Sequence, residues 1–253
     1  MPFITIQGST AYYHQSGDFR ADRPTILFVH GAGGTGNNWV HQLSGIEGYN
    51  CLALDLPGHG RSEGLAADAI IIYREFVWSF AQALDLESFV LAGHSMGGAI
   101  AMELALAYPA ALAGLIIVDS GARLRVSPET LEVLSKGEHP LTNVKYSYSA
   151  NVPSLVLDQA KEEMKSVPTE VYLADFRACD NFNLMNHVKD INLPALVICG
   201  RDDQMTPVKY SEYLINELCK STLILISDAG HMSMLEQPER VNRAIQDFLV
   251  QIV

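Results

Sequence analysis

The sequence predicts an α/β fold, with a mostly parallel β-sheet and helices on both of its faces. Two observations support this prediction. Short apolar runs of strand length alternate along the chain with segments of helical periodicity, which is typical of strands joined by crossover helices. Some of these runs, such as residues 25–30, are apolar at almost every position, as expected for strands covered on both sides.

Eight apolar runs are the expected strands. Residues 2–7 and 10–15 form an opening hairpin around Gly8 and Ser9. The other strands are expected at residues 25–30, 50–55, 88–93, 115–119, 195–199 and 222–226. The helices are expected at 38–43, 68–84, 96–108 and 238–250. Asn37 or Asn38 caps the first of them, and Pro109 ends the third. The second has Ile71, Ile72, Phe76, Phe80 and Leu84 on its apolar face.

The alternation breaks down between Asp119 and Pro194. That stretch has helical patterns at 129–136, 153–165 and 168–178 but no convincing buried strand. Because ligands of open α/β sheets bind at the carboxyl ends of the strands, we interpret it as a helical cap over that edge. An ordinary connection with extra helices is the alternative. We therefore expect a core of residues 1–121 and 191–253 and a cap of residues 122–190.

The composition argues against several classes of function. The chain has 253 residues and a formal net charge of −12, so no nucleic-acid partner is expected. No apolar run reaches membrane length and no signal-peptide pattern is visible, so we expect a cytoplasmic protein without a membrane partner. Cys51, Cys179, Cys199 and Cys219 are too widely spaced for a metal site or a dense disulfide framework. We expect no metal and no cofactor.

The most informative segment is residues 88–102, in which an apolar run ends in Gly93-His94-Ser95-Met96-Gly97-Gly98 and continues as a helical pattern. This indicates a strand, a tight turn and a helix, with Ser95 at the apex of the turn. Small neighbours permit the strained backbone that such a turn requires. Ser95 is therefore the candidate nucleophile.

A serine hydroxyl needs a base, and the base needs a carboxylate that orients it. His231 follows the last expected strand and is the candidate base. The segment after the preceding strand offers two carboxylates, Asp202 and Asp203, while Asp119 is a weaker candidate. The expected donors for a developing oxyanion are the backbone N–H groups of Met96 and of Ala32, in the glycine-rich loop after residue 30.

Together these motifs resemble the α/β-hydrolase superfamily, and within it the capped serine hydrolases: carboxylesterases, carbon–carbon bond hydrolases and cofactor-free haloperoxidase-like enzymes. The resemblance runs nearly end to end, through His30-Gly31, the turn of residues 55–62, the serine turn, Gly200-x-x-Asp203 and Gly230-His231. It implies an eight-stranded sheet with the cap between strands six and seven. It also implies Asp203 rather than Asp202 as the acid.

A serine at the turn indicates acyl chemistry, whereas related dehalogenases and epoxide hydrolases use an aspartate there. We expect hydrolysis of a small-molecule ester, lactone or thioester by a monomer or small homo-oligomer. Three alternatives remain: carbon–carbon hydrolysis of vinylogous diketones, perhydrolase activity, and a ligand-binding receptor. The candidate pocket residues are His30, Gly31, His94, Tyr146, Phe182 and Met232, although aromatic residues of the cap are more typical of a small core between its helices. Arg123, Arg125, Arg177 and Asn181 are conceivable partners for a dienoate carboxylate.

Overall fold

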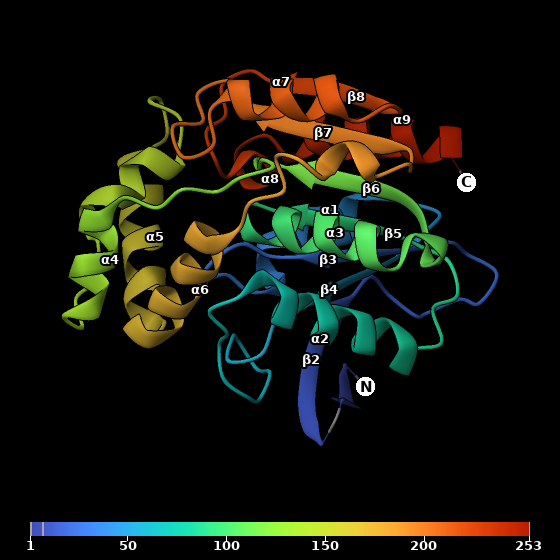
Figure 1. Ribbon diagram of the computed structural model, residues 1–253, viewed down its shortest axis with the longest axis horizontal. Coiled ribbons are helices and arrows are strands. Elements are labelled where there is room, and N and C mark those ends of the chain that lie inside the picture. Colours follow the sequence, from blue (N-terminus) through green and yellow to red (C-terminus); the bar gives the residue numbers. More distant parts are fainter. Residues whose placement is uncertain (1, 7, 253) are drawn as a thin grey trace.

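The computed structural model describes residues 2–6 and 8–252, so position 7 of the predicted first strand lies outside the described residues. The described strands form one sheet in the order β1-β2-β4-β3-β5-β6-β7-β8 (Figure 1). They are β1 (Phe3–Ile6), β2 (Ser9–Gln15), β3 (Thr25–Val29), β4 (Asn50–Leu54), β5 (Phe89–His94), β6 (Leu112–Val118), β7 (Ala195–Gly200) and β8 (Ser221–Ile226). The β1–β2 and β2–β4 pairs are antiparallel and the others parallel, which confirms the predicted sheet.

Helices cover both faces of this sheet. The helices of the core are η1 (Gly36–Trp39), α1 (Val40–Gly45), α2 (Ile70–Ala83), α3 (Met96–Ala107), η2 (Pro109–Ala111), α7 (Val208–Glu217), α8 (Ser233–Glu236) and α9 (Pro238–Ile252). Leu27 and Val29 of β3 belong to the core that includes residues of α2, α3 and α7, whereas Ile26 and Phe28 belong to the core that includes residues of α9, on the other face. Successive side chains of a strand point to opposite faces of the sheet, so this single apolar run contributes to two cores.

The predicted cap of the first short helix is wrong. The helix η1 begins after Thr35, whose side chain accepts a hydrogen bond from the backbone N–H of Asn37. Asn38 completes the cap from inside the helix, because its side-chain oxygen accepts the N–H of Thr35 at 3.0 Å. The N-cap of this helix is therefore a threonine and not, as predicted, an asparagine.

The predicted apolar face of α2 is also wrong at its beginning. Ile71 and Ile72 are 50% and 53% exposed, whereas Ile70, Tyr73 and Val77 are buried. The helix begins at Ile70; Tyr73 lies three residues after it and Val77 a further four, so the three side chains share one face. A run of three isoleucines does not reveal which of them faces the core. The buried face of the helix can be identified only from its later residues.

The chain between β6 and β7 is helical, and we call residues 122–190 the cap segment. It contains α4 (Pro128–Ser135), η3 (Leu141–Ser147), α5 (Ser154–Ser166), α6 (Thr169–Asn181) and η4 (Val188–Asp190). Figure 1 shows α4, α5 and α6 grouped beyond the ends toward which β6 and β7 point. The predicted helical insertion is confirmed, while its exact boundaries as a domain stay a prediction. No helix of residues 2–6 and 8–252 combines the length and apolar character needed to span a bilayer.

Candidate active site

The turn between β5 and α3 places Ser95 at the carboxyl edge of the sheet. Ser95 has φ 52° and ψ −114°, a conformation that is costly for a residue with a side chain. A Cβ atom on Gly93 would lie 2.0 Å from the carbonyl oxygen of Gly97, and one on Gly97 would lie 2.3 Å from the carbonyl oxygen of Val29. Both positions therefore require glycine, so the residues around Ser95 are dictated by the turn itself.

A continuous line of hydrogen bonds connects Ser95 to a buried carboxylate. Oγ of Ser95 lies 2.9 Å from Nε2 of His231, and Nδ1 of His231 lies 2.9 Å from Oδ2 of Asp203. The three residues follow β5, β7 and β8 and meet because these parallel strands end at one edge. Since a carboxylate only accepts, Nδ1 carries the proton of a neutral His231 and Nε2 is free to accept that of Ser95.

The pair of Asp203 and His231 favours its charged form despite its burial. Burial raises the pKa of Asp203, but the charge and hydrogen bond of His231, with the donors of Thr206, bring it down to about 2. Burial lowers the pKa of His231, and the charge and hydrogen bond of Asp203 reverse this, so that it lies above the ordinary value. The N–H groups of Met205 and Thr206 donate to Oδ1 of Asp203 at 2.8 and 2.9 Å. The carboxylate is therefore held from two directions.

The other two candidates for the acid lie outside this line. Asp202 is exposed. Asp119 is fully buried, but it accepts the N–H of Gly200 at 2.7 Å and both the N–H and the hydroxyl of Ser233. It thus joins the last residue of β7 to the first residue of α8. Burial and the charge of Asp203 raise the pKa of Asp119 to about 8.

The loop after β3 lies against the serine. A Cβ atom on Gly31 would lie 3.2 Å from Cβ of Ser95, so the backbone there passes beside the hydroxyl. Among the described residues, no hydrogen bond occupies the backbone N–H groups of Ala32 or Met96. Met96 is also the first residue of α3, and the N-terminus of a helix favours negative charge. Their role as oxyanion donors stays a prediction that this placement suits.

Two histidines predicted near the pocket hold these loops in place. Nδ1 of His30 lies 2.8 Å from the carbonyl oxygen of Gly31, and its Nε2 accepts the N–H of Leu56 at 3.1 Å. Nε2 of His94 lies 2.8 Å from the carbonyl oxygen of His231. Burial lowers the pKa of both histidines, that of His94 to about 3. Both are therefore neutral at pH 7.

The remaining pocket candidates lie in three different environments. Phe182 is 4% exposed and belongs to the core on the α2 side of the sheet. Tyr146 is 39% exposed, with Nζ of Lys145 4.8 Å from its ring centre. Met232 is half-buried against the α9 side of the sheet, and its N–H donates to the carbonyl of Ser147 in the cap segment at 3.1 Å. Contact of these three side chains with a substrate stays a prediction.

A second buried histidine–carboxylate pair was not predicted. Nε2 of His59, in the turn after β4, lies 2.8 Å from Oδ2 of Asp175 in α6. Asp175 also accepts the N–H of Gly33 at 2.7 Å and the hydroxyl of Tyr73. The sequence did contain a signal, because Asp175 lies within the buried stripe of α6 formed by Val171, Tyr172, Ala178 and Cys179. A carboxylate at a buried helical position requires hydrogen-bond partners.

Glu236 of α8 makes another contact between the core and the cap segment. Its Oε1 accepts the N–H of Gly230 at 2.7 Å, and its Oε2 accepts the N–H of Ser149 at 2.9 Å. Gly230 precedes His231, and Ser149 belongs to the cap segment. One carboxylate therefore holds the histidine loop and the cap segment together.

Among the described residues, Asp119, Cys199 and Asp203 place potential metal ligands within 4.8 Å of one another. This set fits a metal poorly. Both carboxylates already accept backbone N–H groups, and burial raises the pKa of Cys199 to about 12. The thiol is occupied as well, because Sγ of Cys199 donates to the carbonyl oxygen of Gly200 at 3.3 Å.

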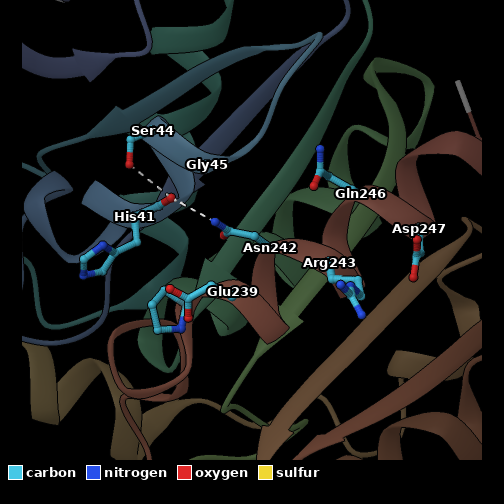
Figure 2. A pocket seen from close by; sticks show the side chains of 9 residues that line it. His41, Ser44, Gly45, Glu239, Asn242, Arg243, Gln246 and Asp247 are labelled. Carbon is cyan, nitrogen blue, oxygen red and sulfur yellow. Dashed lines mark hydrogen bonds between the residues drawn. The ribbon is translucent and has the colours of Figure 1, made fainter.

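A surface groove between α1 and α9 lies apart from the serine (Figure 2). His41 and Ser44 of α1 line one side, and Glu239, Asn242 and Arg243 of α9 line the other. Nδ2 of Asn242 donates to the carbonyl of His41 at 3.0 Å and closes part of the groove. Neither Ser95 nor either of its partners lines it, so the groove has no part in their chemistry.

Comparison with known proteins finds hydrolases that match most of the chain. The family described as "Alpha/beta hydrolase family" matches residues 26–244. The (E)-2-((N-methylformamido)methylene)succinate hydrolase of Acinetobacter baylyi is 30% identical over 95% of this chain and 94% of its own. RutD of Pseudomonas syringae pv. syringae, provisionally named a carbamate hydrolase, is 29% identical over 90% of this chain and 95% of its own. The structure of a thermophilic esterase superposes with a TM-score of 0.87 at 30% identity, covering 99% of this chain and 97% of its own.

Proposed function

The chain belongs to the alpha/beta hydrolase family, and we propose that it hydrolyses carboxylic esters, lactones or thioesters through an acyl-enzyme on Ser95. The proposal depends on one observation, the line from Ser95 through His231 to Asp203 with 2.9 Å at each step. Such a line supplies a nucleophile, its base and the group that orients the base. The similarity to a thermophilic esterase supports the same class of reaction.

In the proposed cycle, Oγ of Ser95 attacks the acyl carbon while its proton passes to Nε2 of His231. The carbonyl electron pair moves onto oxygen, which accepts hydrogen bonds from the N–H groups of Ala32 and Met96. Collapse of this intermediate breaks the bond to the alcohol or thiol, which leaves with the proton from His231. Water then attacks the acyl-enzyme by the same route and releases the acid. Asp203 stays ionised and stabilises the imidazolium.

Carbamate hydrolysis is a second candidate, favoured by the similarity to RutD, since the carbonyl carbon of a carbamate ester can acylate Ser95 in the same step while its alcohol leaves. Carbon–carbon hydrolysis receives less support. Of the four conceivable partners for a dienoate carboxylate, Arg125, Arg177 and Asn181 are exposed, whereas Arg123 is half-buried. Arg125 also pairs with Asp180. We propose a small-molecule acyl substrate, a cytoplasmic location, and a monomer or small homo-oligomer.

The test compares wild type, Ser95→Ala and Ser44→Ala, a surface serine of α1, on 4-nitrophenyl acetate, a 4-nitrophenyl carbamate and a dienoate. We expect a burst of nitrophenol from wild type and from Ser44→Ala. Ser95→Ala should lower kcat by about 10⁴- to 10⁶-fold with an unchanged melting temperature. The proposal is wrong if Ser95→Ala retains turnover or if wild type hydrolyses no activated ester. Binding of these compounds without turnover would instead favour the receptor.

A further inference from the structure

The cap segment places one carboxylate inside the core, at the loop that carries Ala32. Asp175 of α6 is fully buried, and its Oδ2 atom lies 2.7 Å from the backbone N of Gly33 and 2.8 Å from Nε2 of His59. Its Oδ1 atom accepts the hydroxyl of Tyr73 in α2. Three segments of the core therefore converge on one side chain of the cap segment. A buried carboxylate with this many donors is costly to move, because each donor would lose its partner.

The hydrogen-bond partners fix the charges around Asp175. Nδ1 of His59 faces the carbonyl oxygen of Pro57 at 3.0 Å, while its Nε2 faces the carboxylate. Both partners only accept, so both ring nitrogens must donate and His59 is a cation. The ring of His30 lies 4.9 Å from that of His59 and is neutral, because its Nε2 accepts the N–H of Leu56. Asp175 thus has a buried counter-ion and forms an ion pair with it.

Two connections lead from this ion pair to the N–H of Ala32. Gly33 is held by Asp175, and the next residue, Gly34, donates its N–H to the carbonyl of Gly31 at 3.1 Å. That carbonyl also faces Nδ1 of His30 at 2.8 Å. The carbonyl of Gly31 and the N–H of Ala32 belong to one planar peptide unit. Whatever fixes the carbonyl therefore fixes the direction of the N–H.

Packing against α6 reinforces this arrangement. Gly33 has φ +63°, and a Cβ atom built on it would lie 2.0 Å from the ring of Tyr172, the residue one turn before Asp175. The aromatic ring therefore covers the same peptide that the carboxylate holds. The turn is shaped by α6 from two sides, and neither contact comes from the core.

We propose that Asp175 is a positioning residue for the oxyanion hole, so that the N–H of Ala32 is correctly aimed only while α6 is docked on the core. This inference deepens the proposed function and rests on it, because an oxyanion forms only if Ser95 attacks a carbonyl. The cap segment would then contribute to stabilising the oxyanion in the acyl step, in addition to any contribution to substrate specificity.

The test separates an effect on the orientation of the Ala32 N–H from an effect on the stability of the fold. Asp175→Asn keeps the shape of the side chain and removes its charge. Asp180→Asn is the matched control, because Asp180 lies on the same helix but contacts Arg125 and the N–H of Val126. Each variant is measured on 4-nitrophenyl acetate and on the corresponding thionoester, whose sulfur is a poorer hydrogen-bond acceptor and gains less from the oxyanion hole.

We expect Asp175→Asn to lower kcat for the oxoester by about 10- to 100-fold with little change in KM, and to affect the thionoester much less. The ratio of the two rates should therefore fall by about tenfold or more, while Asp180→Asn leaves it unchanged. A merely structural role would reduce both rates in proportion to the folded fraction, and that result would overturn the proposal. If Asp175→Asn does not fold, Tyr73→Phe replaces it, and an unchanged ratio in that variant overturns the proposal as well.

Amide hydrogen exchange of residues 31–36 gives a readout that needs no turnover. We expect faster exchange in Asp175→Asn than in wild type or Asp180→Asn, because a neutral amide oxygen is a weaker acceptor than a carboxylate for the N–H of Gly33. If wild type hydrolyses no ester, the proposed function fails, and this measurement alone decides whether Asp175 positions the loop. Equal exchange in all three proteins would overturn the inference.

Discussion

Two buried histidine–carboxylate pairs lie among the described residues, and they are built almost alike. His231 lies 2.9 Å from Asp203, and His59 lies 2.8 Å from Asp175. The difference is at the other ring nitrogen. In His231 that nitrogen faces the hydroxyl of Ser95, which can donate or accept, whereas in His59 it faces the carbonyl of Pro57, which only accepts. The first imidazole can therefore exchange a proton with its partner, whereas the second faces an acceptor at both ring nitrogens.

The lesson is that the partner of the second nitrogen decides what such a pair can do. Both pairs have a carboxylate that stabilises the imidazolium, and in both the pKa of the histidine is raised even though burial lowers it. Only His231 has a proton donor opposite the carboxylate. The pair at His59 serves instead to join the turn after β4 to α6. Variants of the two pairs should consequently fail in different ways.

Replacing each histidine by glutamine should have the largest effect and the clearest contrast. We expect His231→Gln to lower kcat by about 10⁴- to 10⁶-fold, since the base is lost. His59→Gln should lower the free energy of unfolding by about 3–5 kcal/mol, because Asp175 loses its counter-ion, with a far smaller loss of kcat in the folded fraction. Ester kinetics and urea denaturation measure the two quantities. Equal losses of kcat in both variants would contradict the distinction.

Replacing Asp203 by asparagine should have the next largest effect. An amide at this position can donate to Nδ1 and stabilise the wrong tautomer, so that Nε2 of His231 carries a proton and cannot accept one from Ser95. We expect kcat to fall by about 10⁴-fold while KM changes little. Steady-state kinetics with a crystal structure of the variant would check this. A loss below about tenfold would indicate that Asp119 replaces the acid.

A rise in pH should have opposite effects at the two pairs: it should increase the activity that depends on His231 and decrease the stability that depends on His59. His231 must be neutral to act as a base, so kcat/KM should rise with pH, with a midpoint above the ordinary histidine pKa of about 6.5. The raised pKa of His59 stabilises the fold fully below about pH 6.5, and that contribution is lost as pH rises through the folded-state value. Thermal unfolding of wild type should therefore lose stability with rising pH relative to His59→Gln. Parallel curves for the two proteins would exclude this role of His59.

The sequence predicted the parts of the site that follow strands. Ser95 directly follows an apolar run, and Asp203 and His231 lie in the segments that follow two others; the shared edge of a parallel sheet brings such residues together. Asp175 was not found in this way because its partners, Gly33 and His59, are 142 and 116 residues distant in the chain. Only the docking of α6 creates these contacts, and no local pattern encodes how a helical insertion docks.

Two of the attachments of the cap segment, at Ser149 and at Asp175, have a consequence for protein engineering. At Ser149 the attachment to Glu236 uses a backbone N–H, so any residue except proline can supply it. At Asp175 it depends on a side chain with a negative charge. A cap transplanted from a relative onto this core can thus vary freely at the first junction. At the second, it must bring an aspartate in register with Gly33 and His59.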